Sequence, residues 1–242
     1  MPTIVVFSGA GLSADSGIPT FRDTGGLWEN HKVEDVAEHE AWFKNKELVL
    51  KFYADRFNAY SNSKPHAGHE ALAKLEEKFK VIHITQNIDD LLEQAGCTDV
   101  RHIHGSVTTK KCEWHREINV SDDERFICDY KASMTEPIKL GDVCPKCGGQ
   151  MRPDVVWFNE AVNLSYSEMK DLVKEVKYKA GTFICVGTSV QVYPAGYLVS
   201  FFSQVPSKYI IDKKPQKVAD YKLMEGSASE QLPILVEQLM VG

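Results

Sequence analysis

Residues 3–14 of the chain read TIVVFSGAGLSA, and this stretch decides the fold. The run Thr3–Phe7 is β-branched and aromatic and stops at a glycine-rich segment, which predicts a buried strand. Gly9, Ala10 and Gly11 begin a G-x-G-x-x-(G/A) pattern directly after it. Glycines there allow a tight turn and a close approach of the backbone to a pyrophosphate. The pattern alone is weakly specific, and a glycine-rich turn without a ligand is the alternative interpretation.

Strands and helices alternate along the rest of the chain. Short apolar runs predict the strands, and amphipathic spacing predicts the helices between them. The further strands are expected at residues 80–85, 99–104, 155–158, 182–186 and 208–211, and the helices within residues 33–60, 69–78, 89–94, 167–177, 195–202 and 232–240. This alternation is typical of an α/β fold with a doubly wound parallel sheet, similar to a Rossmann fold.

Residues 107–151 differ from their surroundings. They hold four of the six cysteines and show little helical periodicity. We expect them to form a zinc-ribbon-like module that joins a helical module at residues 33–63 as a small domain. The large, Rossmann-like domain, which would bind the dinucleotide, would then consist of residues 1–32, 64–106 and 152–242.

The composition excludes several classes of protein. The chain has 242 residues and a net charge of −6, which disfavours nucleic acid as a partner. No apolar run approaches the roughly 18 residues that span a bilayer, so a membrane is not an expected partner. The N-terminus lacks the basic region and cleavage site of a signal peptide, and six cysteines are too few for a disulfide scaffold. We therefore predict a cytoplasmic protein, and a monomer by default.

The segment after the glycine pattern argues against a dehydrogenase. Residues 16–23 read SGIPTFRD, and Pro19 prevents a long regular helix there. A hydride-transferring dehydrogenase would continue into a regular helix, a second strand and an acidic residue about 20 positions on. A dinucleotide is still expected, with its ribose and nicotinamide bound in another way.

Several motifs together resemble one family. The stretch GAGLSADSGIPTFRD at residues 9–23 resembles the signature of the sirtuins, a family of NAD-dependent protein-lysine deacylases. The other motifs follow in the family's order: Gln86-Asn87-Ile88-Asp89, His104-Gly105, the Cys144/Cys147 pair, VVWF at 155–158 and GTS at 187–189. The resemblance covers nearly the whole chain. Gly26-Leu27-Trp28 and Tyr53-x-x-Arg56 resemble the class III branch, which includes bacterial deacetylases and desuccinylases.

The resemblance implies NAD as co-substrate and assigns residues to it. Phe21 and Arg22 match the loop pair that shields the ribose C1′ and clamps NAD. Asn87 and Asp89 would contact the nicotinamide and its ribose, and Gln86 a ribose hydroxyl, although short polar residues after a strand also serve as helix caps. The other candidates are Gly9, Ala10, Gly11, Gly187, Thr188, Ser189, Asp212, which stands where the family often has Asn, and Ala228 near the adenine.

His104 is the candidate catalytic base. It ends a predicted strand and precedes Gly105, so its side chain can reach a crevice at the carboxyl edge of the sheet. A neutral imidazole suits the removal of a proton from a ribose hydroxyl, because its ordinary pKa lies near working pH. His102 shares the strand face by the two-residue period and is the lesser candidate.

Tyr53 and Arg56 are the candidate acyl-group receptors. They lie three residues apart and so on one helix face, and an Arg fork beside a Tyr hydroxyl suits a carboxylate. The resemblance implies recognition of succinyl- or malonyl-lysine, while a core Tyr beside a solvated Arg is the alternative. Thr24 stands where the branch often has Ala and would narrow the pocket. Val156 begins the segment that resembles the family's binding strand for the acyl-lysine peptide, in which Asn159 replaces Gly.

The cysteines predict a structural zinc site. Cys144 and Cys147, followed by two glycines, form a good Cys-x2-Cys knuckle. The first knuckle is Cys112 with His115 where the family has Cys. The fourth ligand is therefore His115, which has the better spacing, or Cys128, which is a softer thiolate and makes the site all-thiolate like those of the family. We favour Cys128; a module of reduced thiols without zinc is the third alternative.

The sequence thus predicts an NAD-dependent protein-lysine deacylase that removes acetyl and also succinyl or malonyl groups. Its products would be nicotinamide, O-acyl-ADP-ribose and free lysine. A mono-ADP-ribosyltransferase on the same scaffold and a non-enzymatic NAD sensor or adaptor are the alternatives. A pure binder has no need of His104 beside an intact Gln86-Asn87-Ile88-Asp89, which argues against the sensor.

Overall fold

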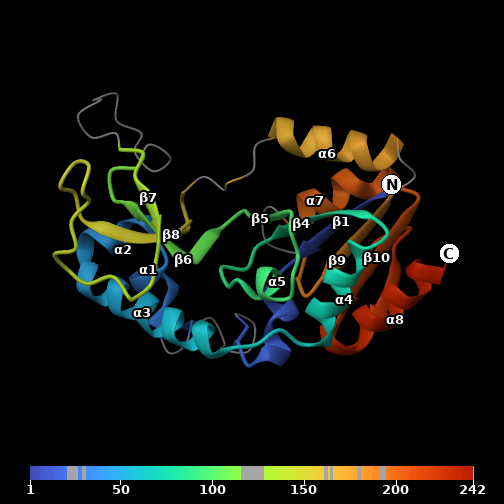
Figure 1. Cartoon of the computed structure of the whole chain (residues 1–242), viewed down its shortest axis with the longest axis horizontal. Coiled ribbons are helices and arrows are strands. Elements are labelled where there is room, and N and C mark those ends of the chain that lie inside the picture. The colour runs from blue at the N-terminus through green and yellow to red at the C-terminus, as the bar shows by residue number, and fades with distance from the viewer. Residues whose placement is uncertain are drawn as a thin grey trace.

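The computed structural model describes residues 1–20, 27–28, 31–115, 128–160, 163, 166–178, 181–190 and 195–241. Two groups of elements lie side by side in it (Figure 1). One group is a large sheet with helices on both faces and holds both termini, and the other is a smaller group of helices and strands. A long cavity, described below, lies where residues of the two groups meet.

The large sheet is parallel throughout. Its six strands are β1 (Thr3–Ser8), β4 (Lys80–Thr85), β5 (Val100–His102), β9 (Thr182–Val186), β10 (Ser207–Asp212) and β11 (Lys222–Glu225), in the order β11-β10-β9-β1-β4-β5. Every neighbouring pair is parallel. The chain leaves β1 towards β4 on one side and returns to β9 on the other. The doubly wound α/β fold is confirmed, with its switch point between β1 and β9, where such folds bind ligands.

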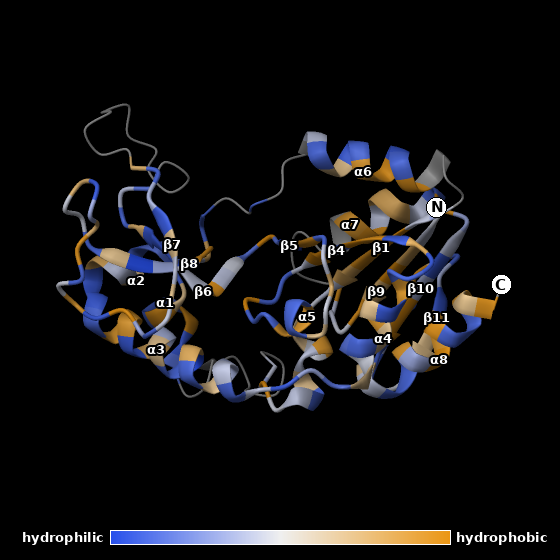
Figure 2. Cartoon of the chain, in the orientation of Figure 1, coloured by the Kyte–Doolittle hydropathy of each residue, from blue (hydrophilic) through white to orange (hydrophobic). Residues whose placement is uncertain are grey.

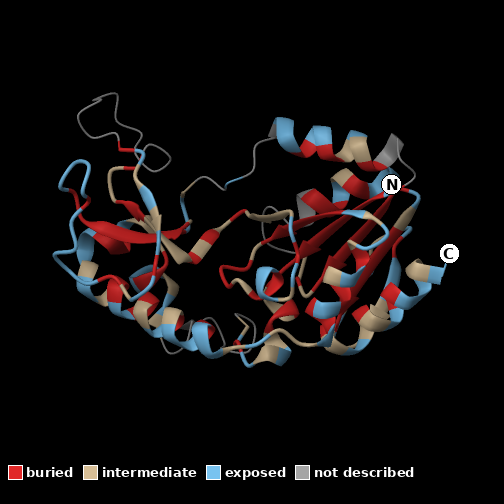
Figure 3. Ribbon diagram, viewed as in Figure 1, coloured by how far each residue is buried: buried red, intermediate tan, exposed pale blue. Residues whose placement is uncertain are grey.

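Helices cover both faces of this sheet. They are α4 (Ala67–Leu75), α5 (Leu91–Gln94) and α8 (Ala228–Val241) on one side and α6 (Tyr166–Tyr178) and α7 (Ala195–Phe201) on the other. Alternate residues of β1 serve the two faces: Ile4 and Val6 pack with α4 and α8, and Val5 and Phe7 pack with α6 and α7. The four central strands β1, β4, β9 and β10 are therefore buried along nearly all of their length (Figure 3), as expected of a parallel sheet covered on both faces. The runs of β1 and β9 are also mostly apolar (Figure 2).

The smaller group joins helices and an antiparallel sheet. Its elements are β2 (Leu27–Trp28), β3 (His31–Lys32), α1 (Val33–Val36), α2 (His39–Lys44), α3 (Lys46–Asn62), β6 (Gly105–Cys112), β7 (Lys131–Ser133) and β8 (Met151–Val155). The three strands pair in the order β7-β6-β8. One core cluster joins α1–α3 to these strands, and its largest side chains include Trp42, Tyr53 and Trp157. The domain boundaries given above stay a prediction.

The strand expected at residues 155–158 is wrong by several positions. The observed strand β8 ends at Val155, and Phe158 makes only an isolated bridge to Glu38. The strand was not predicted because its sequence, MRPDV, carries charged residues although the segment is buried. Arg152 is 1% exposed and pairs with Glu160, while Asp154 pairs with Lys111. Ion pairs made across the fold thus replace the apolar pattern of a strand. Strand β11, which is mostly exposed, was also not expected from its sequence.

No helix in the described ranges is both long enough and apolar enough to cross a membrane.

Candidate active site and metal centre

A cavity of about 1410 Å³ opens at the carboxyl ends of β1, β4, β9 and β10. Most of the residues predicted from sequence line it. They are Ala10, Gly11, Tyr53, Gln86, Asn87, Asp89, His104, Val156, Gly187, Thr188, Ser189, Asp212 and Ala228. Gly9 and Arg56 are not among the described residues that line it. Phe21, Arg22 and Thr24 lie outside the described residues.

The glycines bring the loops after β1 and β9 into contact. Gly9 donates its amide to the carbonyl of Val186 at 3.0 Å, and Gly11 donates to the carbonyl of Gly187 at 2.8 Å. A Cβ on Gly11 would lie 2.7 Å from Cα of Gly187, and Gly187 has φ of +64°. These positions therefore exclude larger residues. The turn leaves Ala10 and Gly11 at the cavity wall, at the switch point of the sheet.

His104 is held in one tautomer. Its Nδ1 lies 3.0 Å from the backbone carbonyl oxygen of Gln86, so Nδ1 carries the proton and Nε2 keeps its lone pair. Burial lowers the pKa of His104, and the bond to the Gln86 carbonyl offsets only part of that effect. The imidazole is therefore neutral at working pH, and Nε2 can accept a proton from a ligand in the cavity.

Asn87 and Asp89 are linked by a serine that the sequence did not mark. The Asn87 amide donates to Oγ of Ser13 at 3.0 Å, and this hydroxyl donates to Oδ2 of Asp89 at 3.0 Å. Burial raises the pKa of Asp89, against the opposing effect of the Leu91 amide and the Ser13 hydroxyl. Ser13 is 1% exposed and lines the cavity. The sequence does not predict this role for Ser13, because Ser13 and Asp89 are far apart in the chain and come together only through the pairing of β1 with β4.

Asp212 and Ala228 also line the cavity. Asp212 ends β10, and its carboxylate accepts the amide of Lys214 at 2.9 Å. Its backbone carbonyl accepts the amide of Gly226 at 3.1 Å, which brings the start of α8 to the cavity. Ser227, which the sequence did not single out, lines the cavity as well.

Tyr53 faces the cavity, whereas Arg56 lies deeper in α3. The Tyr53 hydroxyl and the Trp157 indole N–H are both buried and have no hydrogen-bond partner among the described residues. Burial raises the pKa of Tyr53, so its hydroxyl stays a donor. Arg56 is 1% exposed, its guanidinium lies 3.1 Å from the centre of the Phe52 ring, and its Nη1 donates to the Phe52 carbonyl at 2.7 Å. Only Tyr53 is among the described residues that line the cavity, but the positive charge of Arg56 lies close enough to oppose part of the rise in the pKa of Tyr53.

The segment from Val156 to Asn159 lines the cavity without belonging to a strand. Val156 donates its amide to the carbonyl of His104 at 2.8 Å, and Phe158 donates to that of Ala37 at 2.8 Å. Asn159 has φ of +72°, in the left-handed region that favours Gly. Asn tolerates this region better than most residues, so the replacement of the family's Gly keeps the turn.

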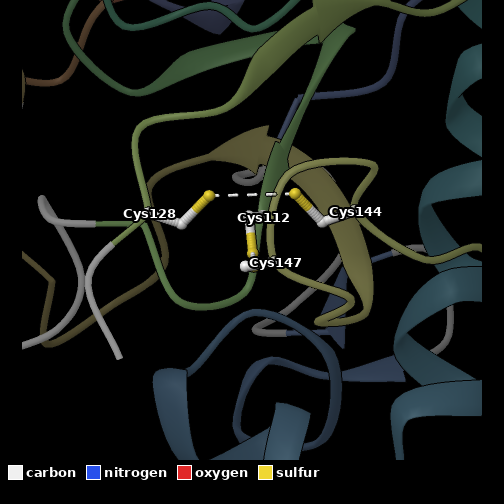
Figure 4. Close-up of side chains that lie close together, drawn as sticks. All are labelled: Cys112, Cys128, Cys144 and Cys147. Atoms are coloured by element: carbon white, nitrogen blue, oxygen red, sulfur yellow. Dashed lines mark hydrogen bonds between the residues drawn. The ribbon is translucent and has the colours of Figure 1, made fainter. Parts of the chain in front are cut away.

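Four cysteines gather at one point of the smaller group (Figure 4). The sulfur atoms of Cys112, Cys128, Cys144 and Cys147 all lie within 4.8 Å of one another. Sγ of Cys112 is 3.3 Å from that of Cys147, and Sγ of Cys128 is 3.7 Å from that of Cys144. Tetrahedral zinc with bonds of about 2.3 Å places its sulfur ligands about 3.8 Å apart, so the set fits zinc. The fourth cysteine is Cys128, as favoured from the sequence, and His115 is not in the cluster. Four protein ligands leave no open position, as in a structural site.

Comparisons with known proteins agree with this arrangement. The sequence model of the Sir2 family matches residues 9–194, and the chain belongs to that family. An NAD-dependent protein deacylase of Bacteroides thetaiotaomicron is 42% identical over 89% of this chain and 87% of its own. One from Pyrococcus furiosus is 38% identical over 97% of this chain and 92% of its own. A solved Sir2 homologue in complex with NAD superimposes with a TM-score of 0.81, at 34% identity over 99% of this chain and 90% of its own.

Proposed function

We propose that this chain is an NAD-dependent protein-lysine deacylase. The observation that carries the proposal is His104, whose Nε2 lone pair is available in a cavity that also presents Asn87, Asp89 and the glycine turn. The relatives named NAD-dependent protein deacylase, at about 40% identity over most of the chain, support the same activity. An acyl-lysine peptide would enter beside Val156, where the cavity meets the smaller group.

The residues divide the work of an acyl transfer. The bond between ribose C1′ and nicotinamide breaks, and the acyl oxygen of lysine takes its place on C1′. His104 accepts the proton of a ribose hydroxyl, which then attacks the acyl carbon. Water completes the release of free lysine and leaves O-acyl-ADP-ribose. Asn87 and Asp89 would bind the departing nicotinamide and its ribose, and Gly11 and Gly187 the phosphates.

Deacylation of one peptide in acetylated, succinylated and unmodified form tests this function. NAD-dependent loss of an acyl group, with formation of nicotinamide and O-acyl-ADP-ribose, is the expected result. Label from NAD that remains on protein, with no loss of acyl groups, would favour the mono-ADP-ribosyltransferase instead. Binding of NAD without turnover of any peptide would favour a sensor.

The acyl specificity is tested at Tyr53 and Arg56. Arg56→Met should lower desuccinylation about tenfold or more, because a hydrogen-bonded charge is lost, and should leave deacetylation near wild type. Tyr53→Phe should lower desuccinylation with little change in the melting temperature, because its hydroxyl has no partner in the described part of the protein. Kinetics with both peptides, and thermal unfolding of each variant, check this.

Arg101→Met provides a control, since it removes an arginine of β5 that pairs with Asp99 and is not among the described residues that line the cavity. It should leave both activities unchanged. Equal losses of both activities in Arg56→Met would show a structural role for Arg56. Removal of acetyl alone by the wild type would contradict the class III assignment and leave the deacylase function in place.

We further propose that the enzyme acts as a monomer in the cytoplasm. Four cysteines grouped as metal ligands are typical of a reducing compartment, where disulfides are rare. Gel filtration and fractionation of the source cells test the two statements.

A further inference from the structure

The imidazole of His102 lies between the loop after β4 and helix α5. Its Nδ1 is 2.8 Å from the backbone carbonyl oxygen of Asn87, and its Nε2 is 2.7 Å from Oε1 of Glu93. Both partners are acceptors, so both ring nitrogens must carry a proton to make both bonds. We propose that His102, kept as an imidazolium by Glu93, is a positioning residue that fixes the Asn87–Asp89 loop for the nicotinamide end of NAD. This inference rests on the proposed function.

The sheet explains why His102 can hold this loop. Strand β5 is the edge strand, and His102 pairs in register with Thr85, the last residue of β4. His102 and His104 therefore donate to consecutive carbonyls of the loop after β4. His102 donates to the carbonyl of Asn87, and His104 donates to that of Gln86. His104 lines the cavity, whereas His102 is not among its described lining residues. His102 thus acts on a ligand only through the loop.

The loop that His102 holds carries the polar groups of the site. From Asn87 the hydrogen bonds continue through Ser13 to Asp89, each link being 3.0 Å long. A shift of the Asn87 backbone would therefore move the amide, the serine hydroxyl and the carboxylate together. At the opposite end of this hydrogen-bond network, His102 is bonded to Glu93 on α5, whose side chain is 42% exposed.

The charges around His102 favour its protonated form. Burial by itself lowers the pKa of His102, but the bond and the charge of Glu93, the Asn87 carbonyl and the charge of Asp89 outweigh it, so the pKa is raised. His102 in turn keeps the pKa of Glu93 below its ordinary value. A second histidine, His83 on β4, also acts on Glu93. Burial lowers the pKa of His83, so this imidazole stays neutral, and its Nε2 bonds the carboxylate of Glu76, the residue after α4.

This arrangement makes the loop sensitive to pH. As pH rises through the pKa of His102, one proton leaves, and the remaining proton stays on Nε2 because the Glu93 carboxylate is the stronger acceptor. Nδ1 then turns a lone pair to the Asn87 carbonyl, and the two acceptors repel. The positive charge that helps to keep Asp89 ionised is lost at the same step. The loop is held below the pKa of His102 and released above it.

Calorimetric titration with NAD over a range of pH tests the proposal. Wild-type affinity should fall as pH rises through the pKa of His102. His102→Asn places a neutral amide donor near the position of Nδ1, so its affinity should stay close to the low-pH value of wild type at every pH. His102→Leu has no donor and should bind NAD about tenfold more weakly throughout, which is the effect of one hydrogen bond to a charged group.

Two controls separate positioning from general destabilisation. ADP-ribose lacks nicotinamide, so its affinity should change much less than that of NAD in His102→Leu. Glu76→Gln alters the other Glu–His pair of this region, does not touch the loop, and should keep the wild-type profile. Thermal unfolding shows which variants fold.

Three results would overturn the proposal: wild-type affinity for NAD in His102→Leu, an equal loss of affinity for NAD and ADP-ribose, or parallel pH profiles of wild type and His102→Asn. If His102→Leu does not fold, the comparison of the pH profiles of wild type and His102→Asn still tests the proposal. None of these titrations uses an acyl-lysine, so a failure of deacylation with intact NAD binding would overturn the proposed function and not this role of His102.

Discussion

Replacement of His104 with Ala should lower NAD-dependent deacylation by about 10²–10⁴-fold, the usual contribution of a general base. The structure gives the reason: the Gln86 carbonyl holds the proton on Nδ1, and Nε2 faces the cavity as an acceptor. NAD affinity should fall far less than the rate, because Nε2 acts on the acyl-transfer step and His102 still holds the loop when the bond from His104 to the Gln86 carbonyl is lost. Single-turnover kinetics and calorimetric binding separate the two effects.

The pH profile gives the same residue a second test. His104 must be neutral to act, and burial lowers its pKa below the ordinary 6.5. Deacylation at saturating NAD should therefore be constant above that pKa and fall as pH drops through it. Wild-type rates from His104→Ala, or an acidic limb that persists unchanged in the residual activity of this variant, would exclude His104 as the base.

Removal of one cysteine ligand should cost the protein its zinc and much of its stability. Structural zinc contributes about 10–16 kcal/mol to the folding of small zinc peptides. Here the sulfur cluster is part of the core: Cys112, Cys128 and Cys144 are buried in the same cluster as Tyr53 and Trp157. Cys144→Ala should therefore bind no zinc, melt at a lower temperature and lose deacylation. Metal analysis and thermal unfolding of the purified protein measure this.

His115→Ala is the matched control for the zinc site. It removes the competing ligand predicted from spacing and should keep one zinc per chain, because His115 lies outside the four-sulfur cluster. Loss of zinc in His115→Ala, or retention of zinc in Cys144→Ala, would contradict the all-cysteine site. A protein that folds equally well with and without zinc would contradict its structural role.

The sequence predicted the fold class and most of the cavity wall because these depend on local patterns. A strand that is buried on both faces must be apolar, so β1 and β9 are visible as short runs. The close contact of the two loops at the switch point admits only glycine at Gly11, and this leaves a pattern in the sequence. His104 follows from its place at the end of a strand, since the carboxyl ends of parallel strands meet at one edge.

The tertiary structure decided what depends on residues far apart in the chain. Strand β8 is hidden in the sequence because Arg152 and Asp154 are neutralised by partners on other segments. Cys128, and not His115, joins the other three cysteines in the folded chain. The spacing of the residues in the sequence does not determine which of the two lies there. Likewise, the link from Glu93 through His102, Asn87 and Ser13 to Asp89 spans four segments. A single hydrogen bond leaves no periodic signal in a sequence, so only the folded chain reveals which polar groups meet.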